Sequence, residues 1–259
     1  MVPDLLYELS MLPRYLTALP VFDEVQHVDS VLDEVLRYSR EVLAVDDGST
    51  DGTAERLARR TDIRLVTHEK NQGYGAALMS AFVYAAQHDF EVLVTVDCDG
   101  QHEPQRIPQF VDACQNADLV SGSRYLEPYN GDGQPPEDRR QINQQVTAEL
   151  NRRLGSSLTD AFCGFKAYRV KALRSLNLTE RGYAMPLELW AQAAAAELNV
   201  VELPVPLIYL DESRSFGGML DDAQTRMDYY HTVIDRSIVA ARTETPLCSK
   251  GDPCGNLVR

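Results

Sequence analysis

Short apolar runs alternate with segments of helical periodicity through the first half of the chain. Such runs predict buried strands, and apolar positions three and four residues apart predict helices between them. This alternation is typical of a largely parallel sheet covered by helices on both faces. The predicted strands are residues 17–21, 42–45, 63–66, 92–96 and 119–121, and the predicted helices are residues 25–38, 53–60, 75–88 and 104–116.

Polar and charged residues follow these predicted strands. In open parallel sheets the ligand binds at the carboxyl ends of the strands, so the residues directly after each strand are the first candidates for a functional site. The segments concerned are residues 23–24, 46–49, 68–73, 97–101 and 122–124, and four of the five are rich in polar or charged groups.

The second half of the chain has a different pattern. Residues 127–138 are dense in Pro, Gly and Asp and predict a long loop. Prolines within residues 200–209 predict an edge strand or two strands broken by proline. We interpret residues 1–14 as an N-terminal extension and residues 243–259 as a mobile tail, which leaves one domain over residues 15–242. The other predicted elements are helices at 139–154, 186–196 and 221–241 and a strand at 165–168.

Composition and charge narrow the class of protein. The chain has 259 residues, of which 44% are hydrophobic, and this is enough for a sizeable core. An excess of 39 acidic over 25 basic residues gives a net charge of -14, which argues against a nucleic-acid partner. An acidic protein that handles a phosphorylated substrate needs a metal ion or well-placed arginines to offset its own repulsion.

Cysteine spacing and hydropathy indicate the compartment. Five cysteines without a C-x-x-C pair indicate neither a disulfide framework nor a zinc site. The N-terminus lacks the pattern of a signal peptide, and no apolar stretch approaches the length of a membrane span. We therefore expect a cytoplasmic protein; peripheral contact with the inner face of the membrane and the oligomeric state stay open.

The strongest local signal is the segment Asp97-Cys98-Asp99-Gly100-Gln101. It places two carboxylates two residues apart at the end of an apolar strand. Hard oxygen ligands of this kind suit Mg²⁺ or Mn²⁺, and such an ion bridges to a diphosphate. The alternative is an ordinary acidic turn, because Asp and Gly are favoured in turns.

A second acidic segment, residues 45–53, also follows a predicted buried strand. Asp51 or Thr53 is expected to cap the helix that follows. Capping does not require the two preceding aspartates, Asp46 and Asp47, whose carboxylates can accept hydrogen bonds from a nucleobase or a ribose.

The ordered motifs together resemble the family 2 glycosyltransferases of GT-A fold, and especially the branch that contains the dolichol-phosphate and polyprenyl-phosphate mannosyl- or glucosyltransferases. The resemblance implies a Rossmann-like α/β domain with a mostly parallel sheet, divided into a donor half over residues 15–125 and an acceptor half over residues 126–242. The motifs are Pro20-Val-Phe-Asp-Glu24, residues 45–53, Asn71-Gln-Gly-Tyr-Gly-Ala-Ala77, residues 97–101, Gly122-Ser-Arg124 and Asp160-Ala-Phe-Cys-Gly-Phe-Lys166.

The resemblance also implies residue roles. Asp97, Asp99 and Gln101 inherit the metal and diphosphate site, with Mg²⁺ or Mn²⁺ as cofactor, and Asp97 also contacts the donor. Asp99, Asp160, Arg124 and Arg139 are the catalytic candidates. The nucleotide-sugar site is implied for Pro20, Glu24, Asp46 and Asp47, and the acceptor site for Arg124, Arg139 and Lys166. Phe22 and Gly73 are further candidates for the nucleotide-sugar site, although a turn before a helix also explains Gly73, and Asn143 and Arg214 are further candidates for the acceptor site.

Three departures from the family pattern stand out. Phe22 and Asp23 replace a Tyr-Asn type of pair, which leaves the nucleobase open. Asn143 stands where the lipid-phosphate enzymes commonly have Ser. Residues 211–218 replace an Arg-x-x-Gly-x-Ser-Lys motif, which counts against a lipid phosphate.

The resulting hypothesis is an inverting hexosyltransferase that uses a GDP- or UDP-linked sugar. The acceptor is a polyprenyl phosphate, a glycan or a small molecule. A phosphate acceptor needs no general base, whereas a hydroxyl acceptor needs a carboxylate, for which Asp160 and Glu188 are the candidates. A structural role remains an alternative for Glu188, and solvent exposure for Arg139 and Arg214. Nucleotidyl transfer, and nucleotide-sugar binding without turnover, are the competing functions.

Overall fold

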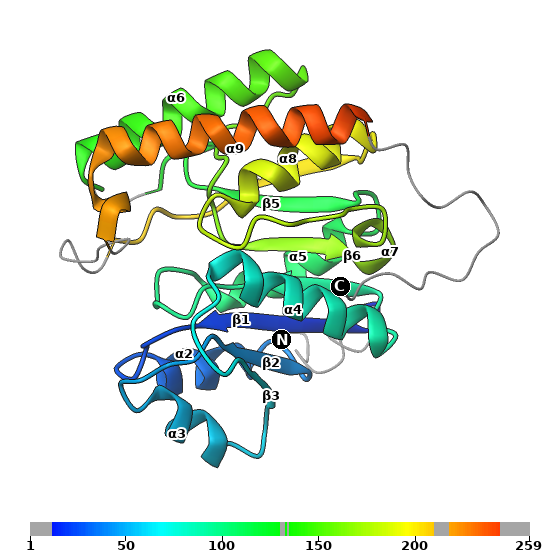
Figure 1. Ribbon diagram of the computed structural model, residues 1–259. Coiled ribbons are helices and arrows are strands. Elements are labelled where there is room, and N and C mark those ends of the chain that lie inside the picture. Colours follow the sequence, from blue (N-terminus) through cyan, green and yellow to red (C-terminus); the bar gives the residue numbers. More distant parts are fainter. Residues whose placement is uncertain (1–11, 130–132, 134, 210–217, 244–259) are drawn as a thin grey trace.

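The computed structural model describes residues 12–129, 133, 135–209 and 218–243 (Figure 1). Within them lies one seven-stranded sheet with the strand order β3-β2-β1-β4-β6-β5-β7. Strand β6 runs antiparallel to both its neighbours, and the other pairs are parallel. The strands are β1 (Tyr15–Val21), β2 (Val42–Asp46), β3 (Arg64–Thr67), β4 (Val92–Thr95), β5 (Leu119–Ser123), β6 (Lys166–Arg169) and β7 (Val200–Pro204).

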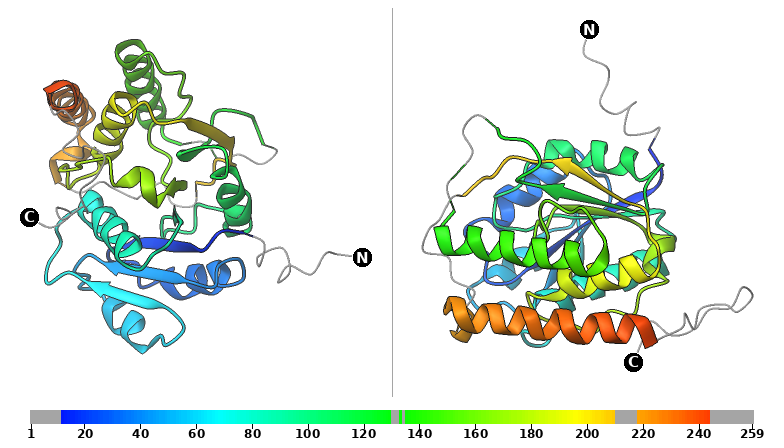
Figure 2. Two further views of the ribbon diagram at one scale, coloured as in Figure 1. Left: turned by 90° about the vertical axis from the view of Figure 1, so that its right-hand side faces the viewer. Right: turned by 90° about the horizontal axis from the view of Figure 1, so that it is seen from above.

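Helices cover both faces of this sheet (Figure 2). Strand side chains alternate between the faces, so Leu16 and Ala18 join one core cluster while Leu19 and Val21 join the other. The first cluster includes α4 (Tyr74–Gln87), α6 (Glu137–Leu154), α7 (Val170–Leu173), α8 (Met185–Ala195) and α9 (Ala223–Thr243); the second includes α2 (Val28–Val35), α3 (Thr53–Arg59) and α5 (Ile107–Ala113), and the 3-10 helices are η1 (Pro104–Arg106) and η2 (Gly218–Asp221).

The antiparallel strand β6 positions part of the site. Lys166 at its amino end pairs with Thr95 of β4 and Ser121 of β5. Because β6 runs against its neighbours, its amino end lies beside their carboxyl ends. Residues 160–165 therefore reach the same edge of the sheet as Asp97 and Arg124.

The mostly parallel α/β sheet flanked by helices that the sequence predicts is confirmed. Strand β3 was expected to be buried, and this is wrong: it is an edge strand, and Leu65 is 37% exposed. The predicted helix at 25–38 is shorter, because a turn in which Glu24 O accepts hydrogen bonds from His27 N and Val28 N precedes α2.

Other element boundaries also differ from expectation. The predicted helix at 104–116 divides into η1 and α5, and α6 begins at Glu137, inside the segment expected to be a loop. Helix α7 was not predicted. Within residues 200–209, the edge strand β7 ends at Pro204, and the residues after it have no regular structure. A single edge strand was one of the two expected arrangements.

Asp51 or Thr53 was expected as the N-cap of α3, and this is wrong, because the N-cap position falls on the glycine between them. Gly52 is the N-cap residue, with φ of 102°. Asp51 Oδ1 accepts hydrogen bonds from Thr53 N at 2.9 Å and Thr53 Oγ1 at 2.6 Å, and Asp51 Oδ2 accepts one from Val25 N at 3.0 Å. Asp51 thus ties the start of α3 to the turn after β1.

None of the helices in the described ranges combines the length and the apolar character needed to cross a membrane. The predicted N-terminal extension falls mostly, and the predicted C-terminal tail almost entirely, on residues outside these ranges. The divisions at residues 14, 125 and 242 stay predictions.

Candidate active site

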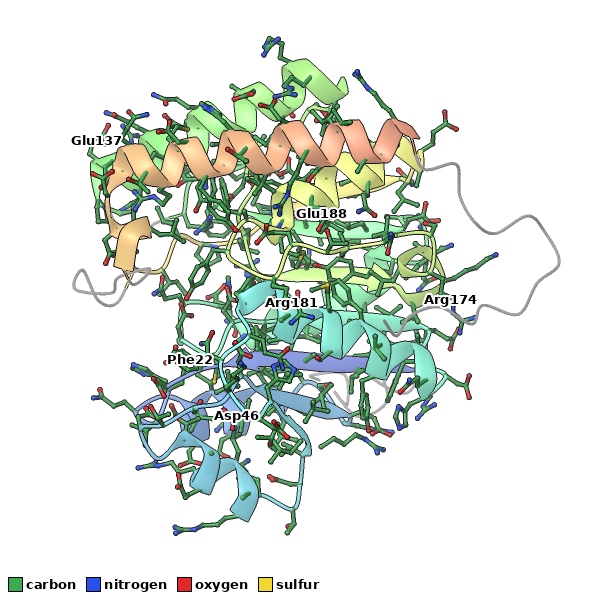
Figure 3. All side chains as sticks on the ribbon, viewed as in Figure 1. Phe22, Asp46, Glu137, Arg174, Arg181 and Glu188 are labelled. Carbon is green, nitrogen blue, oxygen red and sulfur yellow. The ribbon has the colours of Figure 1, made fainter. Side chains whose placement is uncertain are left out.

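A cavity of about 500 Å³ lies at the carboxyl ends of the parallel strands. Phe22 marks this edge of the sheet in Figure 3, whereas Arg174 marks the opposite edge. Both halves of the predicted site line the cavity: Pro20, Phe22, Glu24, Asp47, Gly73, Asp97, Asp99 and Gln101 on the donor side, and Arg124, Arg139 and Asn143 on the acceptor side.

A second cavity, of about 490 Å³, lies at the opposite edge and is lined by Asp89, Arg169 and Arg174 among others. It brings together none of the predicted donor or acceptor residues. Ligands of open α/β sheets bind at the carboxyl ends of the parallel strands, and the first cavity is therefore the candidate active site.

Asp97 is held on both of its carboxylate oxygens. Tyr74 Oη donates to Oδ1 at 2.9 Å, and His102 Nε2 lies 3.2 Å from Oδ2. Burial acts to raise the pKa of Asp97, but the contacts with His102 and Tyr74 outweigh it and hold that pKa below its ordinary value. The carboxylate is therefore ionised, and its orientation is fixed by Tyr74 and His102.

Gly164 closes the space behind Asp97. A Cβ atom at position 164 would lie 2.0 Å from Asp97 Oδ2, a distance that no side chain permits. The backbone of the segment before β6 thus packs directly on the carboxylate. This contact joins the donor side to residues 160–166.

The donor atoms at this edge suit a hard divalent cation. Asp97 and Asp99 both line the cavity and offer only oxygen, while Cys98 between them is buried with 2% exposure. Within the described residues no group of three or more His, Cys, Asp or Glu side chains is gathered for a metal. Mg²⁺ in nucleotide enzymes is commonly bound by one or two carboxylates together with substrate phosphates, so the two aspartates fit such an ion.

The turn after β1 forms the outer wall of the cavity on the donor side. Phe22 is 42% exposed there. Asp23 has a φ of 53°, a conformation that Asp and Asn tolerate better than most residues. Its Oδ1 accepts a hydrogen bond from Thr50 N at 2.7 Å, and its backbone N donates to Ser49 Oγ at 3.0 Å. Asp23 therefore shapes the turn that presents Phe22.

Asp46 and Asp47 have different environments. Asp46 is 1% exposed; its Oδ1 accepts a hydrogen bond from Ser49 N at 3.0 Å, and its Oδ2 is a buried acceptor without a hydrogen-bond partner among the described residues. Asp46 does not line the cavity. Asp47 does, but its oxygens accept hydrogen bonds from Gln72 N at 2.9 Å and Gly73 N at 2.8 Å. Asp47 therefore holds the loop that precedes α4.

Gly73 has a φ of 106°, and a Cβ atom there would lie 2.4 Å from Arg181 O. Ala76 N donates to the same carbonyl at 3.1 Å, and the Arg181 side chain donates to Gln72 Oε1 at 3.0 Å. Figure 3 shows Arg181 beside α4. The start of α4 and the segment before α8 therefore form one wall of the cavity.

On the acceptor side, Arg124 and Asp160 form a bidentate ion pair. Arg124 Nε and Nη2 donate to Asp160 at 2.6 Å and 2.9 Å, and Asn143 Nδ2 donates to it at 2.9 Å. Burial acts to raise the pKa of Asp160, but Arg124 and these hydrogen bonds outweigh it and hold that pKa well below its usual range. Asp160 is fully buried, whereas Arg124 is 26% exposed and lines the cavity.

Helix α6 contributes Arg139 to the same wall. Arg139 Nη1 donates to Tyr209 Oη at 2.9 Å. Arg226 of α9 also lines the cavity, and it donates to Leu220 O at 2.8 Å and to Asp138 Oδ2 at 2.9 Å. The start of α6 is therefore tied to α9 through the residue next to Arg139.

Two predicted acceptor residues are not on this wall. Lys166 is 2% exposed, donates to Cys163 O and lies 5.5 Å from the centre of the Trp190 ring. Burial lowers the pKa of Lys166 from its ordinary value. It does not line the cavity, so direct acceptor contact by Lys166 is not supported. Arg214 lies outside the described residues.

Glu188 has the structural role that was one of its two interpretations. Its carboxylate accepts hydrogen bonds from Thr179 N at 2.8 Å and Glu180 N at 2.7 Å, and from Thr179 Oγ1 at 2.9 Å. Glu188 is 4% exposed and lies on α8 away from the cavity lining. It fixes the segment that packs on Gly73.

A family model described as "Glycosyl transferase family 2" matches residues 18–176. The chain belongs to this family. It is 30% identical over 221 residues to the undecaprenyl-phosphate mannosyltransferase of Micrococcus luteus, covering 81% of this chain and 90% of the relative. It is 31% identical over 203 residues to the polyprenol monophosphomannose synthase of Mycolicibacterium smegmatis, covering 74% and 76%. The predicted family is confirmed, and this family 2 member is a glycosyltransferase enzyme.

Solved structures agree on the fold of this family 2 glycosyltransferase. The glucosyl-3-phosphoglycerate synthase of M. tuberculosis has a TM-score of 0.70 at 18% identity, over 92% of this chain and 85% of that one. The mannosyl-3-phosphoglycerate synthase of Rubrobacter xylanophilus has a TM-score of 0.66 at 18% identity, over 96% and 82%. Family membership favours glycosyl transfer over nucleotidyl transfer and over binding without turnover.

Sequence reasoning did not single out several residues that line the cavity of this glycosyltransferase: Tyr74, Tyr183, Tyr209, Arg226 and Tyr230. Tyr74 lies inside the Asn71–Ala77 motif, so its position was a usable signal. Arg226 is 2% exposed within a helix of mixed polarity, where sequence alone does not separate it from surface arginines. Tyr209 and Tyr230 reach the wall only through the fold.

Proposed function

We propose that this family 2 glycosyltransferase moves a hexose from a nucleoside diphosphate sugar to a polyprenyl phosphate, with inversion at the anomeric carbon. One observation carries the proposal: a single cavity joins the carboxylates of Asp97 and Asp99 to the guanidinium groups of Arg124 and Arg139. Such a cavity holds a leaving diphosphate at one end and an anionic acceptor at the other. The names of the bacterial relatives, which act on undecaprenyl phosphate or make polyprenol monophosphomannose, support a lipid phosphate.

On the donor side, Asp97, Asp99 and Gln101 would hold Mg²⁺ or Mn²⁺ against the diphosphate. The ion would supply positive charge to the leaving group. A related fold, the glucosyl-3-phosphoglycerate synthase of M. tuberculosis, has been solved with Mn²⁺ and UDP, and this supports a divalent cation here. The turn bearing Phe22 and the loop held by Asp47 would enclose the nucleoside.

On the acceptor side, Arg124 and Arg139 would bind and orient the phosphate. A phosphate monoester is already ionised at neutral pH, so its oxygen attacks without a general base. Asp160 supports this mechanism because its carboxylate is fully engaged with Arg124 and Asn143. Its role is then to position Arg124 in the site.

The proposed reaction is a single displacement. An oxygen of the acceptor phosphate forms a bond to the anomeric carbon while the bond from that carbon to the donor diphosphate breaks. The nucleoside diphosphate departs with both electrons of that bond. Because the acceptor and leaving group lie on opposite sides of the carbon, the anomeric configuration inverts. Fixed positive groups around both phosphates lower the barrier most where charge develops.

The test is a transfer assay with UDP-, GDP- and dTDP-hexoses, each with undecaprenyl phosphate in detergent or with 3-phosphoglycerate. We expect one donor to give a lipid-extractable sugar phosphate that requires Mg²⁺ or Mn²⁺ and is lost with EDTA. NMR of the product gives its anomeric configuration. Transfer to 3-phosphoglycerate and not to the lipid would refute the acceptor, and retention of configuration would refute the single displacement.

The acceptor also determines the place of action. A polyprenyl phosphate is anchored in a bilayer by its chain, so the enzyme must meet the membrane surface at the cavity mouth. We therefore propose a cytoplasmic enzyme in peripheral contact with the inner face of the membrane. Sedimentation with vesicles that contain undecaprenyl phosphate, compared with vesicles that lack it, tests this contact.

A further inference from the structure

A hydrogen-bonded chain of three side chains leads away from the cavity wall. His68 Nδ1 lies 2.6 Å from Asp47 Oδ1, and His68 Nε2 lies 2.8 Å from Ser80 Oγ. Asp47 follows β2, His68 follows β3 and Ser80 belongs to α4, so the chain connects three elements. The side chain of Asp47 is 3% exposed and that of His68 is 9% exposed.

The inner end of this chain holds the loop before α4. Asp47 Oδ1 accepts a second hydrogen bond, from Gln72 N at 2.9 Å, and Oδ2 accepts one from Gly73 N at 2.8 Å. Asn71 and Gly73 of this loop line the cavity, as does Asp47 itself. The orientation of one carboxylate therefore fixes the backbone that faces the donor side.

The proton positions in the chain follow from the chemistry of its members. An ionised carboxylate only accepts hydrogen bonds, so His68 must donate from Nδ1 to Asp47. In the neutral imidazole Nε2 is then the acceptor, and it takes the hydroxyl hydrogen of Ser80. Asp47 thereby fixes the His68 tautomer, and the hydroxyl of Ser80 satisfies the remaining ring nitrogen.

A hydrogen-bonded chain of Asp, His and Ser also occurs in nucleophilic serine enzymes, but the chain here lies elsewhere relative to the cavity. Neither Ser80 nor His68 lines the candidate cavity. Only Asp47 reaches the wall, and there it contacts backbone amides. The chain is arranged to orient a carboxylate, and a nucleophilic serine would have to face the substrate.

We propose that His68 and Ser80 are positioning residues of the donor site, which hold Asp47 so that it gives residues 71–73 the shape that receives the nucleoside. The inference rests on the proposed nucleotide-sugar donor. Hydrogen bonds to a charged carboxylate are stronger than neutral ones, so losing the His68 bond frees Asp47 to rotate. The amides of this loop then lose their fixed acceptor. Ordering the loop when the donor binds then costs free energy, which weakens binding.

The experiment compares two variants of His68, in each of which a side-chain amide takes the place of one ring nitrogen. His68→Asn retains a donor near the Nδ1 position and loses the Ser80 contact, whereas His68→Gln reaches toward the Nε2 position and loses the Asp47 contact. Ser80→Ala removes the outer partner alone. His88→Asn is the matched control, because the His88 side chain is exposed at the end of α4 and its Nδ1 bonds to Tyr84 O, one turn away on the same helix. All variants are first checked for cooperative thermal unfolding.

The readouts are calorimetric binding of UDP and GDP with Mn²⁺, and the KM for the donor set against kcat. We expect His68→Gln to weaken nucleotide binding and to raise the donor KM by about tenfold, with kcat changed by less than about twofold. His68→Asn should recover most of this loss, Ser80→Ala should show a smaller loss, and His88→Asn should bind like the unmodified protein.

Equal binding by His68→Gln and the unmodified protein would overturn the inference. Equal losses for His68→Asn and His68→Gln would also overturn it, because packing and not the Asp47 bond would then be responsible. The unmodified protein itself tests the proposed function: if it binds neither UDP nor GDP with Mn²⁺, the donor assignment has failed and not the role of His68.

Discussion

The donor side and the acceptor side of the cavity are built in different ways. On the donor side, short segments after β2 and β4 carry the carboxylates, and several of these accept bonds from nearby backbone amides, as Asp46 does from Ser49. On the acceptor side, charged side chains hold one another across long stretches of chain: Arg124 pairs with Asp160, and Arg226 with Asp138. The donor carboxylates therefore lie within short sequence motifs, whereas the charged pairs of the acceptor side are brought together only by the completed fold.

The largest effect is expected where the donor site meets the leaving group. Asp99→Ala should lower turnover by about 10³-fold, because a preorganised charge at the developing diphosphate is lost. Turnover at saturating donor and a range of Mn²⁺ concentrations measures this. Asp112→Asn on the exposed face of α5 is the matched control and should be unchanged. Full activity of Asp99→Ala at low Mn²⁺ would remove the metal assignment.

Removing the buried charge of the acceptor side should instead lower the free energy of unfolding. Asp160→Asn leaves the Arg124 guanidinium without its buried counter-charge, and we expect a loss of about 3 kcal/mol in the free energy of unfolding. Urea unfolding measures it. Glu137→Gln, which breaks a pair with Arg140 on the exposed start of α6, should have no measurable effect. Similar losses in both variants would mean that burial does not distinguish the two pairs.

The same pair predicts how stability depends on pH. The pKa of Asp160 is well below its usual range in the folded protein, so its contribution is present above the unfolded pKa of about 3.9 and is lost as pH falls toward the folded value. The stability difference between the unmodified protein and Asp160→Asn should therefore stay constant from about pH 7 to pH 5 and shrink below about pH 4. A difference that shrinks already near pH 6 would contradict this.

One contact links the two sides and allows a smaller, sharper test. Gly164→Ala places a Cβ atom against the Asp97 carboxylate, and we expect about a 100-fold loss of turnover through misplacement of that group. Gly155→Ala is the contrasting variant, because Gly155 has a φ of 69° with open space around it. It should cost about 1 kcal/mol of stability and leave turnover unchanged. Equal turnover in the two variants would show that the packing of residue 164 on the Asp97 carboxylate does not matter for turnover.

The contrast between the two sides also explains which features of the fold and the site could be predicted from the sequence. The alternating strands and helices, the Asp97 to Gln101 segment and the acidic turn after β2 were predictable because apolar periodicity and strand-end placement are local properties. The exposure of β3 was not, since its position at the edge depends on strand order. Lys166 was expected in the acceptor site, but β6 turns its side chain toward Trp190. Arg226 was missed for the converse reason: only packing of α9 on α6 brings it to the cavity.

The smallest effect is expected at Tyr209, whose hydroxyl is one partner of Arg139. Tyr209→Phe keeps the ring in the wall and removes only that hydrogen bond, so the guanidinium retains its charge but loses part of its orientation. We expect the KM for undecaprenyl phosphate to rise about threefold, because a part-buried hydrogen bond contributes about 0.5 to 1.5 kcal/mol. The donor KM should not move, since Tyr209 belongs to the acceptor side. Steady-state kinetics with each substrate varied in turn separates the two constants. If both rise together, the two sides of the cavity are coupled through this wall, and the division into a local donor site and an assembled acceptor site does not extend to function.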